Sequence, residues 1–157
     1  MQAIPQQTPA AGRRPPQLTV ITNDDDAKIA LYRMARIVYA ETRAQSLRSV
    51  EALAAMTVNL CEKTGRTLQD VVKDESVFES LSKNSARHKD LLVDSSRADF
   101  QMCLRVVRRT LSGRRGADGR SPDLVCGATC FHREENLPEW AAAKGYIAQV
   151  DGLLFYA

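Results

Sequence analysis

The chain has 157 residues, and 44% of them are hydrophobic, so its size suits one domain with a substantial core. Its 22 Lys and Arg residues exceed its 19 Asp and Glu residues, which gives a net charge of +3. This mild excess favours anionic partners without demanding nucleic acid. Four cysteines in a chain of this length do not indicate a disulfide scaffold.

The first 23 residues contain Pro and Gln but no apolar run of the kind that a signal peptide or a membrane span requires. We therefore expect a disordered leader over residues 1–23 and a single folded domain over residues 24–157. If the protein acts outside the cytoplasm, we expect lysis or a dedicated secretion apparatus to deliver it, since an ordinary cleaved signal is not evident.

Two helices are predicted in the first half of the chain. Asn and Asp residues precede an apolar stripe at three- and four-residue steps, which predicts a helix over about 25–42. Residues 49–61 are apolar nearly all round, which is typical of a central, buried helix, and Gly65 supplies its end. Cys61 falls on an apolar face of this helix, so we expect a buried thiol.

The middle of the chain is less regular. Thr67 and Asp70 form a capping-box pattern for a short helix over 67–74. Residues 75–94 have no period, so we expect a loop of the kind that often carries function. Four apolar residues should anchor this loop: Phe78, Leu81, Leu91 and Leu92.

A further helix is predicted over residues 95–113, with Ser95 or Ser96 as its cap and Gly113 as its exit. Five residues should point inward from it: Phe100, Cys103, Leu104, Val107 and Leu111. A connector without periodicity follows over residues 114–123.

The C-terminal part changes character. Residues 125–132 read as a strand, and residues 137–145 as a short helical or irregular piece. Residues 146–157 form two strand patterns around Asp151 and Gly152, which is a strong hairpin signal. The order of elements predicts an α+β fold, a helical body followed by a small antiparallel sheet at the C-terminal end.

Glu41 is the most unusual residue of the first helix, because Ala30, Met34, Ile37 and Val38 place it on the buried face. The negative end of the helix dipole and the loss of water both disfavour its carboxylate form. A carboxyl group that keeps its proton near neutral pH can protonate a glycosidic oxygen. Alternatively, the helix has frayed by this point, and Glu41 meets solvent beside Arg36 or Arg43.

Two separated stretches resemble one known family. ARIVYAETRAQSLRSVEALAAMTVNLC, residues 35–61, resembles the opening of the spore-cortex-lytic (SleB-like) cell-wall hydrolases. GATCFH at 127–132, the Trp140 that follows it and the terminal LLFYA are similar to the end of that family. The resemblance covers about residues 27–157. In the first stretch the matching residues are Ala35, Arg36, Tyr39, Ala40, Glu41, Arg43 and Asn59.

The resemblance implies a lysozyme-like domain that cleaves peptidoglycan between N-acetylmuramic acid and N-acetylglucosamine, in the periplasm or cell wall. It implies that Glu41 is the catalytic acid and base. We expect no metal or other cofactor. The residues that it suggests for the substrate groove are Phe78, Ser80, Thr129, His132, Trp140 and Tyr156.

The chain departs from the family at three places. Ala44 and Gln45 stand where the family usually has Gly and Glu, which weakens a second-carboxylate role there. Cys130 replaces an aromatic residue. Residues 77–79, followed by Ser80, replace a Gln-Phe-Ser motif, so the sugar contacts of the loop differ.

The sequence singles out one acidic residue, Glu41, and the mechanism of a lytic transglycosylase needs only one. Glu41 would protonate the leaving oxygen and then, as a base, activate the 6-hydroxyl of the muramic acid, which closes an anhydro ring. Hydrolysis by a muramidase is the second mechanism. Hydrolysis normally uses a second carboxylate. The candidates are Glu79, Asp94 and Asp99, and their positions in the sequence do not indicate which of them, if any, lies opposite Glu41.

Trp140 is the only Trp, and it follows Pro138 in a predicted loop. Its ring suits the apolar face of a pyranose. A lid over the core of the sheet is an equally good interpretation.

His132 has three interpretations. Cys126, Cys130 and His132 would share one face of an ideal strand, which suggests zinc with His88 as an extra ligand, but four ligands and tighter cysteine spacing are usual. Cys130 as a nucleophile with His132 as its base would suit a peptidase, although neighbours on one strand rarely have that geometry. A hydrogen-bonding groove or core histidine is favoured. Cys126 and Cys130 could also form a disulfide in an oxidising compartment.

A rival function is a non-catalytic module that binds the cell wall or nucleic acid through an arginine-rich face. This face lacks the interleaved aromatic residues of a single-strand binder and any known recognition module. We therefore expect peptidoglycan rather than nucleic acid as the partner. The arginines concerned are Arg105, Arg108, Arg109, Arg114, Arg115 and Arg120.

Overall fold

The first helix, α3 (Asp24–Thr42), carries the apolar stripe that the sequence predicts. Ala30, Met34, Ile37 and Val38 are each at most 2% exposed, so this face is buried as expected. This computed structural model describes residues 24–113 and 125–157. The predicted leader and the predicted connector lie outside those residues.

The second helix, α4 (Leu47–Thr64), is the central element expected from its composition. The side chain of Ser46 accepts a hydrogen bond from the Ser49 N–H at its start, and Gly65 ends it with a φ of 72°. Glycine adopts this left-handed backbone conformation readily because it has no Cβ atom. Cys61 is a buried free thiol, as predicted.

The short helix α5 (Leu68–Val71) begins as predicted, because the Thr67 side chain accepts the Asp70 N–H at 3.1 Å. It ends three residues before the predicted boundary at 74. The N–H groups of Lys73 and Asp74 bond to carbonyls three residues back, at 3.2 Å each, so the chain turns there instead of continuing the helix.

The segment expected as a loop contains two short 3₁₀-helices, η1 (Glu79–Leu81) and η2 (His88–Leu92). Phe78 is fully buried and anchors this segment as predicted. Leu92 does not, because it is 86% exposed. Successive residues of a 3₁₀-helix point about 120° apart, so Leu91 and Leu92 cannot both face the core.

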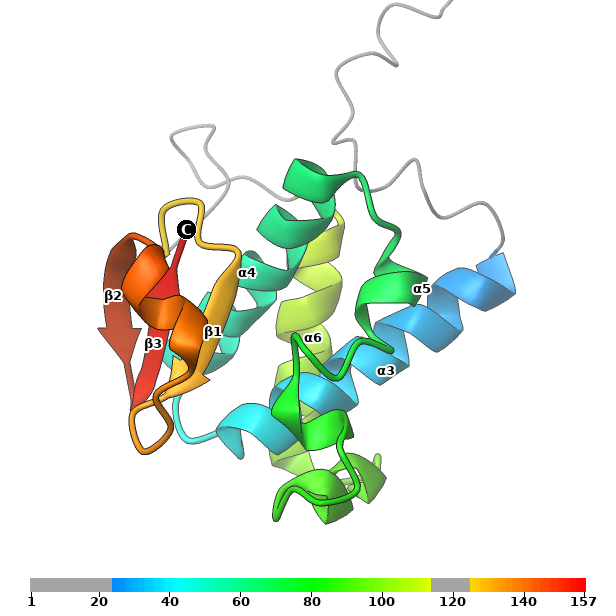
Figure 1. The fold of residues 1–157 in the computed structure, drawn as a ribbon. Helices are drawn as coiled ribbons and strands as arrows, with labels where there is room; N and C mark the ends of the chain where they lie inside the picture. The colour runs from blue at the N-terminus through cyan, green and yellow to red at the C-terminus, as the bar shows by residue number, and fades with distance from the viewer. Residues whose placement is uncertain (1–23, 114–124) are drawn as a thin grey trace, which may run out of the picture.

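The long helix α6 (Ala98–Leu111) buries all five residues predicted to point inward. The predicted serine cap is wrong. Arg97 is the residue before the helix and makes no side-chain cap, while the Ser96 hydroxyl and N–H donate to Asp94 Oδ1 at 2.8 and 2.9 Å. Helix α6 packs against both α3 and α4 (Figure 1).

Three antiparallel strands form a sheet in the order β1 (Cys130–Arg133), β3 (Leu153–Tyr156), β2 (Tyr146–Val150). The predicted hairpin between β2 and β3 is confirmed: Asp151 and Gly152 have φ values of 48° and 81°, as a type I′ turn requires. The 3₁₀-helix η3 (Glu139–Ala143) lies in the connection from β1 to β2, where a short helical or irregular piece is expected.

The predicted strand over residues 125–132 is correct only in its last three residues. Cys126 and Gly127 have φ values of 47° and 84°. These left-handed conformations end any extended run, so the strand begins only at Cys130.

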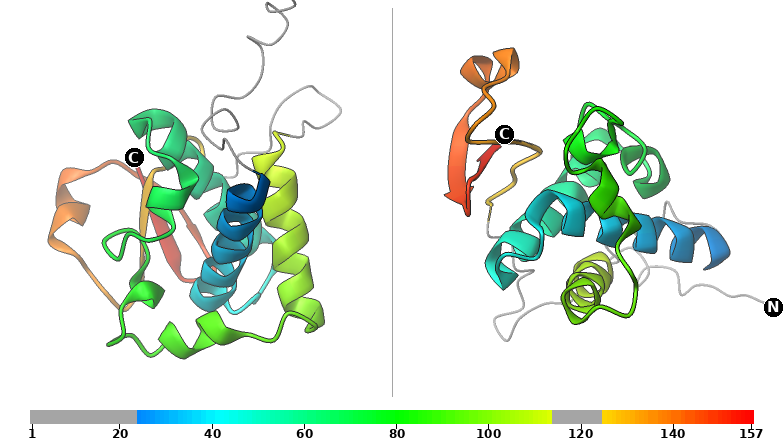
Figure 2. Two further views of the ribbon diagram at one scale, coloured as in Figure 1. Left: turned by 90° about the vertical axis from the view of Figure 1, so that its right-hand side faces the viewer. Right: turned by 90° about the horizontal axis from the view of Figure 1, so that it is seen from below.

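The sheet lies to one side of the helices (Figure 2). Three aromatic rings join the two parts. The ring centroid of Phe131 lies 6.2 Å from that of Phe78 and 6.1 Å from that of Phe155. The predicted α+β arrangement is therefore confirmed. Within residues 24–113 and 125–157, no helix is both long and apolar enough to cross a membrane.

Candidate functional site

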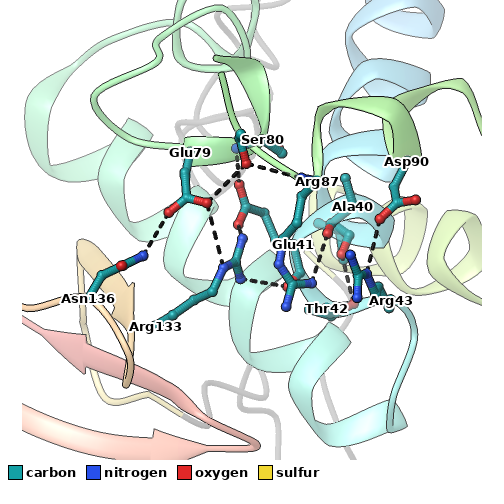
Figure 3. Close-up of polar contacts among 12 residues, drawn as sticks. Ala40, Glu41, Thr42, Arg43, Glu79, Ser80, Arg87, Asp90, Arg133 and Asn136 are labelled. Atoms are coloured by element: carbon teal, nitrogen blue, oxygen red, sulfur yellow. Dashed lines mark hydrogen bonds and ion pairs between the residues drawn. The ribbon is translucent and has the colours of Figure 1, made fainter. Parts of the chain in front are cut away.

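Glu41 lies in the last turn of α3, and its residue is only 1% exposed. The Ser80 N–H donates to Glu41 Oε2 at 2.8 Å, and Arg133 donates to Oε1 (Figure 3). The carboxyl group is therefore buried but not unpaired. Both partners come from segments far along the chain, η1 and β1, so the tertiary structure holds this side chain in one position.

The frayed-helix interpretation of Glu41 is wrong. The helix continues to Thr42, and both arginines that could have paired with an exposed Glu41 are engaged elsewhere. Arg43 pairs with Asp90 at 3.0 Å, and Arg36 donates to the Val93 carbonyl at 2.6 Å.

Two arginines cover the carbonyl end of α3 beside Glu41. Arg133 Nη1 donates to the Glu41 carbonyl at 2.9 Å, and Arg87 Nη1 donates to the Ala40 and Glu41 carbonyls at 3.2 and 3.1 Å. They satisfy carbonyls that have no partner within the helix and place positive charge at its negative end. Burial, with repulsion from Arg133 and Arg43, lowers the pKa of the Arg87 guanidinium.

An open cleft of about 590 Å³ lies in front of Glu41, between the η1 segment, β1 and η3. Its charged lining is mostly acidic, with Glu41, Glu75, Glu79 and Glu135 against the single cation Arg133. Trp140 and Phe131 supply aromatic surface to the same cleft. An elongated neutral molecule with apolar faces and hydroxyl groups suits this lining.

Glu79 provides a second carboxylate in the cleft. Its position in the sequence did not indicate this. Its Oε1 accepts from Asn136 Nδ2 at 2.9 Å and its Oε2 from Ser85 Oγ at 3.0 Å, while Arg133 Nε lies 4.0 Å from Oε2. Arg133 thus contacts both carboxylates. The other acids considered, Asp94 and Asp99, do not line the cleft.

A smaller cavity of about 190 Å³ lies behind the ion pair and is lined by the hairpin residues Asp151 and Gly152. Glu41, Arg133 and Glu135 line both this cavity and the cleft. The Arg133–Glu41 contact therefore forms the partition between the two spaces.

His132 is hydrogen-bonded at both ring nitrogens, as its favoured interpretation expects. Nδ1 lies 2.7 Å from the Arg133 carbonyl oxygen. A carbonyl oxygen can only accept a hydrogen bond, so Nδ1 carries a proton. Nε2 lies 2.9 Å from the Tyr156 hydroxyl, which donates to it when the ring is neutral. The Trp140 ring packs edge-on against Tyr156, with 5.3 Å between centroids.

The residues suggested for the groove take different places. His132 and the half-buried Trp140 line the cleft. Phe78 is fully buried against Phe131. Ser80 donates to Glu41 through its backbone N–H. The buried Oγ of Ser80 has no hydrogen-bond partner among the described residues. Thr129 and Tyr156 are buried at the start of β1 and the end of β3, joined through the Thr129 N–H and the Tyr156 carbonyl at 2.9 Å.

The zinc argument for Cys126, Cys130 and His132 fails at Cys126. This exposed residue lies in a turn before β1, so it does not share a strand face with the other two. No group of three or more potential metal ligands occurs within the described part of the chain. Burial raises the pKa of the half-buried Cys130 thiol, which disfavours the thiolate that a nucleophile requires.

The sequence did not reveal Arg133, Arg87 or Asn136 as parts of the site. Arg133 and Asn136 come directly after the GATCFH motif, and this proximity is the only signal that could have indicated them. Arg87 lies in an irregular loop, and only the tertiary structure brings it to the end of α3.

Comparisons with known proteins identify the fold. The chain is similar to the catalytic domain of the germination-specific lytic transglycosylase SleB from Bacillus anthracis, with a TM-score of 0.59 and 14% identity over 82% of this chain and 93% of that chain. It is also similar to the catalytic domain of the Bacillus cereus SleB protein, with a TM-score of 0.57, 14% identity, and coverage of 82% and 89%. No family model and no curated protein sequence matches. The chain therefore has the fold of SleB catalytic domains.

Proposed function

We propose that this protein cleaves the glycan strands of peptidoglycan between N-acetylmuramic acid and N-acetylglucosamine, in the periplasm or cell wall. Glu41 acts as the general acid and base. The observation that carries the proposal is the position of this carboxyl group, buried at the end of α3 and lining a cleft of about 590 Å³, in a fold shared with the SleB catalytic domains.

The contacts of Glu41 suit the half of an acid–base cycle in which its side chain is a carboxylate. In its protonated form the side chain donates to the glycosidic oxygen. The Arg133 guanidinium and the Ser80 N–H then stabilise the carboxylate that remains. That carboxylate accepts the proton of the muramic acid 6-hydroxyl, which attacks the anomeric carbon and closes the anhydro ring. The attacking hydroxyl belongs to the substrate, so no second carboxylate is needed to hold a water molecule.

Hydrolysis is the second candidate mechanism, and the position of Glu79 favours it. This side chain lies in the same cleft as Glu41 and contacts the same arginine. A second carboxylate in the cleft could orient a water molecule or stabilise the oxocarbenium-like transition state. The two mechanisms give different products: 1,6-anhydro ends for transglycosylation and reducing ends for hydrolysis.

The test compares wild-type protein with Glu41→Gln on purified peptidoglycan, with mass spectrometry of the released fragments. The amide keeps the shape of the side chain but cannot cycle a proton, so we expect a loss of about 10²–10⁴-fold in product formation. Glu62→Gln, on the exposed surface of α4, is the matched control and should keep full activity. Unchanged product formation by Glu41→Gln would refute the assignment.

The rival, a non-catalytic binding module, is an outcome of the same experiment. Arg105 and Arg108 are exposed on α6, while Arg109 pairs with Glu51 at 2.8 Å. The other arginines of the predicted face lie outside the described residues. If the rival is correct, no soluble fragments appear from wild-type protein, and Arg105→Glu with Arg108→Glu abolishes its co-sedimentation with peptidoglycan or its binding to DNA.

A further inference from the structure

A third cavity, of about 520 Å³, lies between α3, the end of α5 and the 3₁₀ segments. Its apolar wall consists of Ile37, Val72, Leu81 and Leu91. Figure 1 shows α5 lying beside α3, and the lining residues Val72 and Lys73 directly follow α5 in the chain. None of these residues takes part in the acid–base contacts of Glu41.

The rim of this cavity is cationic. Arg33, Arg36 and Lys73 line it, and Glu75 is the only acid among its lining residues. Arg33 and Lys73 are exposed and form no ion pair within residues 24–113 and 125–157. These two side chains are therefore available for an anionic ligand.

Arg36 has a structural role in the same cavity. Its Nη1 donates to the Val93 carbonyl at 2.6 Å, and its guanidinium carbon lies 5.2 Å from the centroid of the Phe100 ring. These contacts fix the segment that carries Leu91, so the wall of the cavity is formed before any ligand binds.

The cavity adjoins the glycan cleft. Glu75 lines both spaces. Ile37 in the cavity wall lies four residues before Glu41 and hence one helical turn away on the same face of α3. A polymer that fills the cleft can therefore extend a side branch into the cavity.

We propose that this cavity binds the peptide stem of peptidoglycan, which rests on the function proposed above. The charges of the two spaces differ in sign: the cleft is mainly acidic and the cavity mainly basic. Peptidoglycan has the matching division, because its disaccharide backbone is largely uncharged whereas its stem carries free carboxylates beside alanine methyl groups. The carboxylates lie against Arg33 and Lys73, and the methyl groups lie against the apolar wall.

The first experiment measures binding without cleavage. A synthetic, sugar-free stem tetrapeptide is titrated into the wild-type protein and into Arg33→Glu/Lys73→Glu, with binding followed by NMR. We expect binding to the wild-type protein that weakens about tenfold in the double variant and also falls with added salt. No binding to the wild-type protein, equal binding by both proteins, or tighter binding of a phosphate-bearing oligonucleotide would overturn the assignment.

The second experiment compares cleavage of stem-bearing peptidoglycan with cleavage of glycan from which an amidase has removed the stems. The double variant should raise KM about tenfold on the stem-bearing substrate and leave the stem-free rate unchanged. The control Arg48→Glu/Lys144→Glu makes the same change in net charge at two exposed residues that line neither cavity nor cleft. An equal effect of the double variant on both substrates would count against a stem site. If the function proposed above is wrong, the wild-type protein will cleave neither substrate.

Discussion

Arg133 in β1 and Glu41 at the end of α3 form a buried ion pair across 92 residues of sequence. The side chains are 6% and 0% exposed. A second bond runs from Arg133 to the Glu41 carbonyl at 2.9 Å. One side chain therefore connects the sheet to the helical body, closes the end of α3 and fixes the proposed catalytic group.

Replacing Arg133 with Met should destabilise the protein by about 3–5 kcal/mol, because it leaves the buried Glu41 carboxylate without its cationic partner. The measurement is the free energy of unfolding from urea denaturation. Glu41→Gln combined with Arg133→Met should recover part of this loss, because no charge is then left unpaired. A double variant that is no more stable than Arg133→Met would contradict this explanation.

Glu79→Gln distinguishes the two cleavage mechanisms. If Glu41 acts by transglycosylation, as we propose, the variant should still release anhydro fragments, because Glu79 is not needed to activate a water molecule. Muramidase chemistry that depends on Glu79 would instead lose about 10²-fold in rate. The readout is mass spectrometry of the fragments. Exposed Glu139→Gln serves as a matched control in η3.

Trp140 should report directly on occupation of the cleft. It is the only Trp in the chain and lines the cleft beside His132. Titration of Glu41→Gln with peptidoglycan fragments should change the indole fluorescence in a saturable way. Trp140→Ala should raise KM about tenfold through lost ring contact, with little change in stability. If Trp140 is mainly a lid over the sheet, stability will fall and KM will not change.

The buried thiols give the protein an alkaline limit. Burial raises the pKa of Cys61 to about 11 and that of Cys103 to about 12, from a usual value of 9.0. The folded state holds these protons more tightly than the unfolded state. Their contribution to stability is therefore complete below pH 9.0 and is lost as the pH rises through about 11 and 12.

Melting curves at rising pH test this behaviour, because the melting temperature should fall above the usual thiol pKa of 9.0. Cys103→Ala should show a smaller decrease. At about pH 8 a thiol reagent should modify the exposed Cys126 rapidly and the two buried thiols only on unfolding. Rapid modification of all four cysteines in the folded protein would contradict the burial of Cys61 and Cys103.

Local patterns in the sequence determine the elements of this fold. The stripe that ends at Glu41, the capping pair Thr67 and Asp70, and the turn at Asp151 and Gly152 are each set by interactions within a few residues. Local chemistry also explains the errors. The strand predicted from residue 125 ignored the left-handed conformations of Cys126 and Gly127, which apolar alternation does not reveal.

The sequence by itself placed Glu41 on the apolar stripe of the first helix, because helical periodicity fixes the direction in which a side chain points. Only the structure excluded the alternative of a frayed, solvent-exposed helix end. Only the tertiary structure decided the partners of Glu41. Ser80, Arg133 and, through that arginine, Glu79 lie 38 to 92 residues away along the chain. No local period encodes such distances, because these contacts depend on how the loop and the sheet pack against α3.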